Sequence, residues 1–444
     1  MSEAGASIST TAAPGCSHFS GQDKPTWELY STCIHCGLCL NHCPTYRVLG
    51  TEMDSPRGRI YQVLQVDSGR LAIGESFVTH IDRCLDCRAC ETACPSGVQY
   101  GHIVERARAQ IETHHKRPWA SRMTRRLFYK GVLKNTLILQ RVAGVLRFYQ
   151  KSGLQWMVRK ARVLKLFGMA DMERLSPQID DEFFFQEIGK VYPARGAKRG
   201  RVAFHAGCIA NVAFSELNRA SVRVLQENGV EVVISAEQGC CGALHAHAGF
   251  RDDARELARR NIEAFLDSGV DAIITNAAGC GSTLKEYDDL LREDPAFAAK
   301  AKDFVGKVRD ITEYLWEIGL RPPARASGEQ VTYQDPCHLA HGQRVRLAPR
   351  EVMRAVGAKV VEMAHSDYCC GSAGTYNVTQ NELSMKILER KMDDVERTSA
   401  PTLVTANVGC MLQLRAGVAR RGLKMNVKHV VQLLDEAYQG KASD

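Results

Sequence analysis

Sixteen of the 17 cysteines in this chain fall into two repeated patterns whose spacings suit metal binding or electron transfer. In the first pattern, four cysteines are separated by two, two and three residues, and proline follows the last. This run occurs at Cys33, Cys36, Cys39 and Cys43, and again 51 residues later at Cys84, Cys87, Cys90 and Cys94. Three thiolates at steps of three residues allow one tight loop to ligate three irons of a cluster.

The same spacing occurs in bacterial two-cluster ferredoxins, where the fourth cysteine of each run ligates the cluster of the other run. It predicts two [4Fe–4S] clusters, one bound by Cys33, Cys36, Cys39 and Cys94 and the other by Cys84, Cys87, Cys90 and Cys43. Four thiolates also suit zinc, but zinc modules usually carry separated Cys-x-x-Cys pairs. Four-member runs that close on proline therefore favour iron–sulfur clusters.

The second pattern is a pair of widely spaced sets, each built around a Cys-Cys-Gly sequence. The first set is Cys208, Cys240, Cys241 and Cys280, and the second is Cys337, Cys369, Cys370 and Cys410. Equivalent members lie 129 or 130 residues apart, which indicates two half-domains that arose by duplication. Because a repeated fold alone would not preserve four cysteines in each copy, we predict a cofactor-binding or redox role for all eight.

The elements around these cysteines alternate between short β-branched segments and amphipathic helices. In the first copy, strands over 201–208 and 230–235 enclose a helix over 215–228, and a second helix over 252–269 leads to another strand. The second copy repeats this order, which indicates a mainly parallel sheet in each half. Each cysteine falls at or just past the C-terminal end of a strand, where open α/β sheets bind their ligands. We therefore expect the four thiols of each half to converge.

The chain of 444 residues has room for about three domains, and its composition is that of a globular protein. We predict an α+β multidomain fold in which an α-helical two-cluster ferredoxin-like domain precedes a duplicated α/β Cys-Cys-Gly domain. The expected parts are a disordered tail (1–24), the ferredoxin-like domain (25–112), a basic helical connector (113–195), and Cys-Cys-Gly repeats 1 (196–325) and 2 (326–440).

The net charge of +8 is concentrated in the connector, since residues 113–170 carry fourteen lysines and arginines and no acidic residue. Recurring apolar pairs indicate amphipathic helix, which Gly131, Gly144 and Gly153 would break into pieces. Such a segment, with Trp119 and Trp156, is typical of peripheral contact with an anionic membrane surface. Docking on an acidic partner subunit and an ordinary solvated face are the alternatives, and we expect no nucleic-acid partner.

The chain shows no signal-peptide pattern and no run of about 18 apolar residues. We therefore expect a cytoplasmic location, where thiols stay reduced and bind metals. A peripheral position on the cytoplasmic face of the inner membrane is the open alternative.

The pairing of a two-cluster module with two Cys-Cys-Gly repeats resembles the heterodisulfide-reductase-like iron–sulfur subunits. Within that group, the segments CIHCGLCLNHCPTYRVLGTEMDSPRGRIYQ, GCCGALHAH, CCGSAGTY and VTANVGC are most similar to the iron–sulfur subunits of bacterial glycolate oxidases. The resemblance covers about residues 25–438. It implies an electron-transfer subunit of a flavin-dependent 2-hydroxy-acid oxidoreductase with a non-NAD acceptor. FAD-binding oxidase subunits would oxidise glycolate to glyoxylate, and electrons would pass toward quinone or another membrane acceptor.

One departure from the wider group concerns the Cys-Cys-Gly sites. Its members end each repeat with Cys-x-x-Cys, whereas this chain has Thr283 and Gln413 at the positions of the fifth cysteine. The non-cubane cluster and its disulfide chemistry are therefore not expected, and each half holds an ordinary [4Fe–4S] cluster, a zinc ion or no metal. The alternative functions are an iron–sulfur subunit of a lactate or glycerol-3-phosphate dehydrogenase, or a thiol–disulfide reductase subunit.

Several other side chains lie near the predicted sites. Each has a functional interpretation, as a ligand, proton relay or loop contact, and a structural one, as a packed or helix-starting residue. They are His35, His42, Arg57, Arg59, His245, His247, His338 and His341, while Cys16 is expected to be a free thiol.

Overall fold

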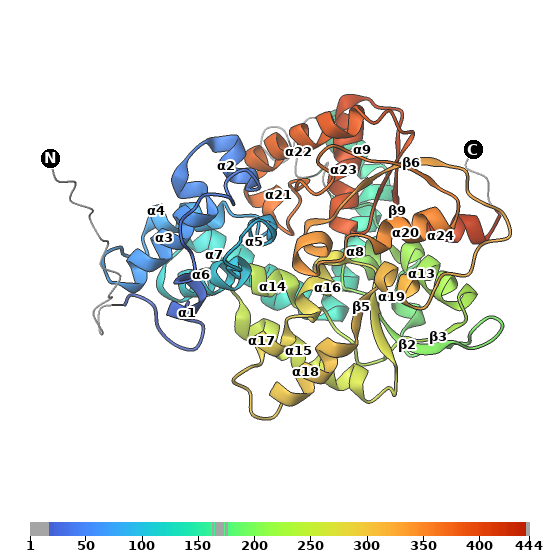
Figure 1. Ribbon diagram of the computed structural model, residues 1–444, viewed down its shortest axis with the longest axis horizontal. Coiled ribbons are helices and arrows are strands. Elements are labelled where there is room, and N and C mark those ends of the chain that lie inside the picture. Colours follow the sequence, from blue (N-terminus) through green and yellow to red (C-terminus); the bar gives the residue numbers. More distant parts are fainter. Residues whose placement is uncertain (1–16, 162–163, 165–172, 174–175, 441–444) are drawn as a thin grey trace.

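The computed structural model describes residues 17–161, 164, 173 and 176–440 (Figure 1). Cys16, Arg162 and Lys165 lie outside these described residues. Along the chain, a helical region with the two four-cysteine runs is followed by a helical connector and then by two α/β units, one for each Cys-Cys-Gly repeat. The predicted α+β fold class is confirmed.

Short helices build the region of the four-cysteine runs, and they enclose a core that includes Val63, Phe77 and Ile103. These elements are α1 (Trp27–Tyr30), α2 (Pro44–Leu49), η1 (Glu52–Asp54), α3 (Pro56–Asp67), α4 (Glu75–Asp82), α5 (Ala89–Thr92) and α6 (Tyr100–His114). Helices α2 and α3 both begin at a proline, a residue that suits the first helical turn because it lacks an N–H.

Residues 17–24, which the composition assigns to a disordered tail, pack onto this helical region. The backbone N–H of His18 donates to the carbonyl of Val66 at 3.2 Å, and that of Ser20 donates to Oε1 of Gln110 at 2.8 Å. Phe19 is buried in the same core as Phe77. The predicted tail is therefore too long, because one buried aromatic side chain and these hydrogen bonds order the segment.

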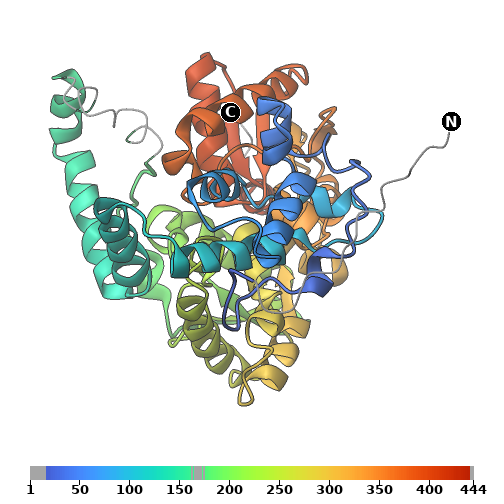
Figure 2. The same cartoon turned by 90° about the vertical axis from the view of Figure 1, so that its left-hand side faces the viewer.

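The connector forms four helical pieces, which lie along the left edge of the molecule in Figure 2. They are α7 (Trp119–Arg126), the π-helical η2 (Leu127–Leu133), α8 (Thr136–Lys151) and α9 (Leu154–Lys160), and the 3-10 helix η3 (Phe184–Glu187) follows. Of the three predicted breaks, only Gly153 separates two helices, since Gly131 lies inside η2 and Gly144 inside α8. Leu139 and Ala143 of α8 are buried in the core of the α/β units, which fixes the helix to the body.

Repeat 1 is built on a sheet with strand order β1-β3-β2-β4-β5, in which β1 alone is antiparallel to its neighbour. Its strands are β1 (Val191–Tyr192), β2 (Gly200–His205), β3 (Val230–Val233), β4 (Ala272–Thr275) and β5 (Val308–Asp310). Its helices are α12 (Ala210–Ala213), α13 (Ser215–Glu227), α14 (Ala243–His247), α15 (Arg251–Leu266), α16 (Ala278–Leu284), α17 (Tyr287–Leu290), α18 (Ala298–Lys307) and α19 (Ile311–Glu317). The predicted helices over 215–228 and 252–269 correspond to α13 and α15.

Repeat 2 has an all-parallel sheet in the order β7-β6-β8-β9. Its strands are β6 (Gln330–Gln334), β7 (Lys359–Val361), β8 (Thr402–Thr405) and β9 (Asn426–His429). Its helices are the π-helical η4 (His338–Gly342), α20 (Ala348–Ala355), α21 (Tyr376–Thr379), α22 (Asn381–Glu396), α23 (Val408–Arg421) and α24 (Val430–Tyr438). One core that runs through both sheets, with Phe204 of β2 and Tyr333 of β6 among its buried members, joins the repeats into a single body.

Candidate functional site

The two four-cysteine runs fold into loops with the same backbone conformation. His35 and Gly37 in the first loop, and Asp86 and Arg88 at the equivalent positions of the second, all have positive φ between 53° and 84°. This left-handed pattern turns the chain so that successive thiols can face a common centre. A Cβ on Gly37 would lie 2.7 Å from Nη1 of Arg57, so a side chain at this position would displace the guanidinium.

The fourth cysteine of each run lies with the other run, as the ferredoxin pattern predicts. Cys43 lines one small buried cavity together with Cys84, Cys87 and Cys90. Cys94 lies close enough to Cys33 for the two thiols to interact electrostatically. The two proposed ligand sets are thus brought together by the fold.

The sulfur donors fit a bound cluster in their chemistry as well as in their grouping. Burial raises the pKa of Cys39 to about 11 and holds the pKa of Cys90 well above its usual range. Such thiols are neutral on their own at pH 7, and binding a cation or cluster converts them to thiolates. A pocket of four buried sulfurs is therefore stabilised by the group it binds.

Arg57 and Arg59 contact these loops, and both also lie at the start of α3. The functional interpretation, a loop contact, and the structural one, a helix start, therefore both apply to these residues. The Nη1 of Arg57 donates to the carbonyl of His35 at 3.1 Å in the first loop. Arg59 is fully buried, and it donates to the carbonyl of His80 at 2.7 Å and to the hydroxyl of Thr45 at 3.2 Å. Thr45 follows Cys43 by two residues, so Arg59 positions the start of α2.

The four cysteines of each Cys-Cys-Gly repeat converge, as predicted from their places at the strand ends. In repeat 1 the thiols form a hydrogen-bonded chain, from Cys208 through Cys240 and Cys241 to Cys280. Repeat 2 forms the equivalent chain, from Cys337 through Cys369 and Cys370 to Cys410. We call these groups quartet 1 and quartet 2.

The glycine of each Cys-Cys-Gly sequence allows the following helix to pack against the thiols. Gly371 has a φ of 89°, and a Cβ on it would lie 2.5 Å from the carbonyl oxygen of Ser384 in α22. Gly242 has a φ of 81°, and its nearest neighbour is the Cα of Ala254 in α15, at 3.4 Å. Both glycines therefore need the left-handed conformation, and Gly371 also needs the space.

The positions of the missing fifth cysteine are buried and filled by polar side chains. Thr283 lies one turn after Cys280 in α16, and Gln413 one turn after Cys410 in α23. Nε2 of Gln413 donates to Oγ of Ser384 at 3.0 Å, and its Oε1 accepts a hydrogen bond from Asn377. Each quartet thus has four sulfur donors, which suits four-coordinate binding.

Quartet 2 adjoins the second four-cysteine loop directly. The thiol of Cys87 is hydrogen-bonded to that of Cys369, and this contact together with burial raises the pKa of Cys87 well above its usual range. Around the contact, Leu85 and Ala89 of the loop pack against Tyr376 and Ile387 of repeat 2. The structure therefore places two sulfur sites from distant parts of the sequence in contact.

The four histidines named in the sequence are packed between the domains. His245 bonds the carbonyl of Tyr129 at 2.8 Å, and His341 bonds the hydroxyl of Thr92 at 2.9 Å. His338 contacts the carbonyl of Asp86 at 3.0 Å and stacks on His247, with ring centroids 5.1 Å apart. These contacts favour the structural interpretation of all four.

His247 belongs to a buried ionic network that sequence reasoning missed. Its Nδ1 lies 2.8 Å from Glu105 and 3.1 Å from Asp86, and although burial opposes the charge, these carboxylates raise the pKa of His247 to about 9. Arg88 pairs with Glu286 across the same interface, and Arg251 with Glu105 at 3.1 Å. No local pattern signals this network, since its members are brought together only by the docking of the domains.

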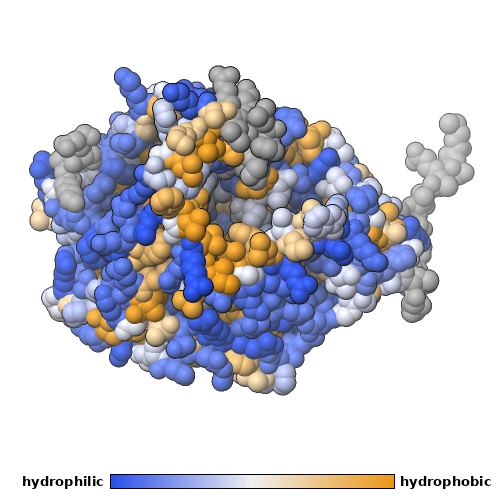
Figure 3. All heavy atoms as spheres, turned by 180° about the vertical axis from the view of Figure 1, so that it is seen from behind, coloured by the Kyte–Doolittle hydropathy of each residue, from blue (hydrophilic) through white to orange (hydrophobic). Residues whose placement is uncertain are grey.

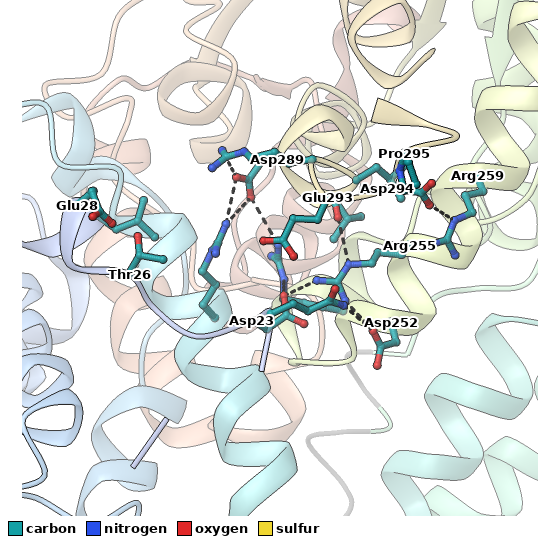
Figure 4. Close-up of a pocket in the computed structure, with 17 residues that line it drawn as sticks. Asp23, Thr26, Glu28, Asp252, Arg255, Arg259, Asp289, Glu293, Asp294 and Pro295 are labelled. Carbon is teal, nitrogen blue, oxygen red and sulfur yellow. Dashed lines mark hydrogen bonds and ion pairs between the residues drawn. The ribbon is translucent and has the colours of Figure 1, made fainter. Parts of the chain in front are cut away.

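The same network continues into a cavity of about 610 Å³ between α6, α15 and α17 (Figure 4). No cysteine lines it, and its arginines are paired with acids. Arg251 lies 2.7 Å from Asp23, Arg259 lies 2.7 Å from Asp294, and Arg255 bonds both Asp23 and Asp252. The ion pairs that line the cavity therefore connect the domains, and the sulfur sites lie outside it.

Comparison with known proteins places this arrangement in a family. Residues 30–98 match a family described as 4Fe-4S dicluster domain, and residues 202–285 and 331–415 match the Cysteine-rich domain. Residues 120–176 match the glycolate oxidase iron-sulfur subunit, linker region. A probable glycolate oxidase iron-sulfur subunit of Bacillus subtilis is 40% identical, and the match covers 93% of this chain and 94% of that protein. This chain belongs to the family of glycolate oxidase iron–sulfur subunits.

Other relatives differ in how much of the chain they match. The glycolate oxidase iron-sulfur subunit of Escherichia coli is 34% identical over 93% of this chain and 95% of its own length. Lactate utilization protein A of Oceanobacillus iheyensis is 27% identical, and the match covers 98% of that protein but 54% of this chain. Of the relatives described here, the two that match over most of both chains are glycolate oxidase iron-sulfur subunits.

The linker region of this family member exposes an apolar and basic surface, which we call the connector face. Trp119, Met123 and Leu127 lie at steps of four residues along α7 and η2, and Arg122 and Arg126 lie between them. On α8, Val145 and Phe148 are 71% and 69% exposed, and the exposed Arg141 lies beside them. Figure 3 shows the hydrophobic strip that crosses this side of the molecule.

Many of the connector's cations are already paired within the chain. Lys134 lies 2.9 Å from Asp253, and Arg117 lies 2.7 Å from Asp82. Among the described residues, Arg122, Arg126 and Arg141 form no ion pair, and these three arginines lie beside the exposed apolar residues. None of the described helices is long and apolar enough to cross a membrane.

Proposed function

We propose that this chain is the electron-transfer subunit of a flavin-dependent glycolate oxidase. FAD-binding partner subunits would oxidise glycolate to glyoxylate, and this chain would pass the electrons toward quinone. The observation that carries the proposal is the continuity of the sulfur sites, which extends from the exposed Cys36 to the buried contact between Cys87 and Cys369. When bound, the clusters supply one-electron carriers, and electrons move through protein only between centres that lie close together.

The residues of the chain would hold and insulate the carriers. Cys33, Cys36, Cys39 and Cys94 would ligate one [4Fe–4S] cluster, and Cys84, Cys87, Cys90 and Cys43 the other. The buried Arg59 and the apolar wall around Cys87 exclude water from the second site, and a low dielectric there tunes the reduction potential. Quartets 1 and 2 offer four thiols each, for a further cluster or a zinc ion.

Glycolate is favoured over lactate because the full-length relatives are named for glycolate, whereas the lactate utilization proteins match only about half of the chain. The test is anaerobic purification of the chain with its flavin subunits, followed by iron and sulfide analysis and EPR. At least two [4Fe–4S] centres should be reduced by glycolate. Zinc without labile sulfide, or clusters that only lactate or glycerol 3-phosphate reduces, would overturn the proposal.

The connector face would hold this otherwise cytoplasmic subunit at an anionic membrane, close to a quinone acceptor. Each unpaired arginine near such a surface contributes about 1 kcal/mol, and the exposed tryptophan and leucine side chains add apolar burial. In vesicle flotation we expect binding to vesicles that contain an anionic lipid and not to neutral ones. Val145→Glu with Phe148→Glu should abolish flotation while cluster content is unchanged. Equal flotation of this variant would show that the connector face does not bind the membrane.

A further inference from the structure

The two four-cysteine loops present equivalent surfaces to different surroundings. Residue for residue, Ile34, Cys36 and Leu38 of the first loop correspond to Leu85, Cys87 and Ala89 of the second. Because both loops share the same left-handed turns, each presents its two apolar side chains on either side of the middle cysteine. One chain thus contains two copies of a single surface.

The second copy shows what this surface does when it is covered. Leu85 and Ala89 are 4% and 6% exposed, and they pack with Tyr376, Leu383 and Ile387 of repeat 2. At the centre of that packed patch, Cys87 touches Cys369 of the next sulfur site. The loop surface therefore serves as an interface that brings a neighbouring redox site against the middle cysteine.

The first copy is uncovered. Ile34 and Leu38 are 69% and 58% exposed, and Cys36 between them is exposed as well. The partly exposed ring of Tyr61 extends the patch, with its centroid 6.5 Å from that of His35. Large apolar side chains gathered around a cluster ligand are typical of an unoccupied protein interface.

The exposed loop is held in position from within. Arg57 donates to the carbonyl of His35 and also pairs with Glu52 at 2.7 Å, so its guanidinium braces the turn. A braced loop loses little conformational entropy on binding, which favours association.

The charge of the loop indicates what kind of partner it fits. Residues 31–42 contain no aspartate, glutamate, lysine or arginine, in contrast to the arginines of the connector face. In Figure 2 the connector lies at the left edge, while α1 to α3 lie to its right and toward the viewer. An uncharged apolar loop suits a protein surface, and the benzenoid edge of a flavin ring is itself apolar and able to pass electrons.

We infer that the loop of the first run is the docking surface for the flavin-bearing subunit, with Ile34 and Leu38 as its central contacts and Cys36 as the point where electrons enter. This inference rests on the proposed function. Oxidation of the hydroxyl carbon of glycolate releases two electrons and two protons to the flavin. The electrons cross the loop one at a time, the protons leave the flavin to solvent, and a quinone finally takes up two electrons and two protons.

The test uses the complex of this chain with its flavin subunits. Ile34→Asp and Leu38→Asp are compared with Leu347→Asp, which charges an equally exposed apolar residue elsewhere (64%). A double variant with Ile34→Asn and Leu38→Asn removes the apolar contacts without adding charge, so it separates these two effects. Iron and sulfide content and the EPR spectrum after dithionite reduction show that the clusters are intact in every variant.

Ile34→Asp and Leu38→Asp should each bind the flavin subunits at least about tenfold more weakly, since loss of a central apolar contact typically costs that much. Glycolate-driven cluster reduction should slow by a similar factor, while reduction by dithionite stays as in the unaltered chain. Leu347→Asp should change neither quantity.

The possible outcomes separate the docking inference from the function. If the loop variants bind and are reduced like the unaltered chain, the docking inference is wrong and the function stands. If they lose binding but glycolate reduces no cluster even in the unaltered complex, docking stands and the substrate assignment fails. If the unaltered chain binds no flavin subunit, both are wrong.

Discussion

Replacing Gly371 by alanine tests whether the Cys-Cys-Gly glycine is needed for conformation alone or also for space. A left-handed φ of 89° costs an alanine about 1–2 kcal/mol. The new methyl group would also lie 2.5 Å from the carbonyl oxygen of Ser384, so α22 must move, and overpacking of this kind costs about 1–3 kcal/mol more. We therefore expect a total destabilisation of about 2–5 kcal/mol.

Two matched variants isolate the contributions. Gly422→Ala changes a glycine with φ of 63° and nothing within 4 Å, and Gly242→Ala changes the equivalent glycine of repeat 1, whose nearest contact is 3.4 Å away. Both should cost only the conformational part, about 1–2 kcal/mol. The assay is urea unfolding followed by circular dichroism under anaerobic conditions, with the variants compared by the shift in midpoint. Equal shifts for Gly371→Ala and Gly422→Ala would refute the steric argument.

Three further predictions follow from the sulfur sites and the ionic network. Cys43→Ser and Cys84→Ser should change the EPR signal of one cluster, and Cys94→Ser and Cys33→Ser that of the other; if Cys43→Ser and Cys33→Ser instead affect the same cluster, the exchange of fourth ligands is wrong. Because the pKa of His247 rises from about 6.5 unfolded to about 9 folded, its contribution to stability is complete below about pH 6.5 and is lost as pH rises toward 9. His247→Gln should flatten the dependence of the free energy of unfolding on pH in this range. An unchanged dependence would show that another group causes it. Glu286→Gln should weaken the ion pair with Arg88 between the domains and raise protease cleavage near residues 113–118. The control is Glu382→Gln, which removes an exposed ion pair with Lys386 and should not change the cleavage.

Much of the fold and the grouping of the sulfur sites could be predicted because the relevant signals are local. Ligand spacing, strand and helix periodicity and a nearly constant internal offset can all be read from one sequence, and they place Cys208 and its three partners at one end of a sheet. The contact of Cys87 with Cys369 could not be predicted, because it depends on how two domains dock. The same is true of Asp86, Glu105 and His247, which are far apart in the chain.

The order of residues 17–24 was missed for a different reason. Small polar residues dominate the N-terminal segment, and composition averages over the individual side chains that anchor it, such as the buried Phe19 and the paired Asp23. The connector was only partly predictable, since its acid-free sequence shows where charge accumulates but not which cations are paired. Asp253 and Asp82 neutralise Lys134 and Arg117 from other domains, which leaves the arginines of the connector face unpaired.

The covered second loop also bears on how the protein matures. Once repeat 2 closes over Leu85, Cys87 and Ala89, an iron–sulfur scaffold can no longer reach these thiols from outside. The cluster of the buried loop must therefore be delivered before the C-terminal half docks, while the uncovered first loop stays accessible afterwards. Synthesis from the N-terminus suits this order, because the segment that must be loaded early leaves the ribosome before the segment that seals it.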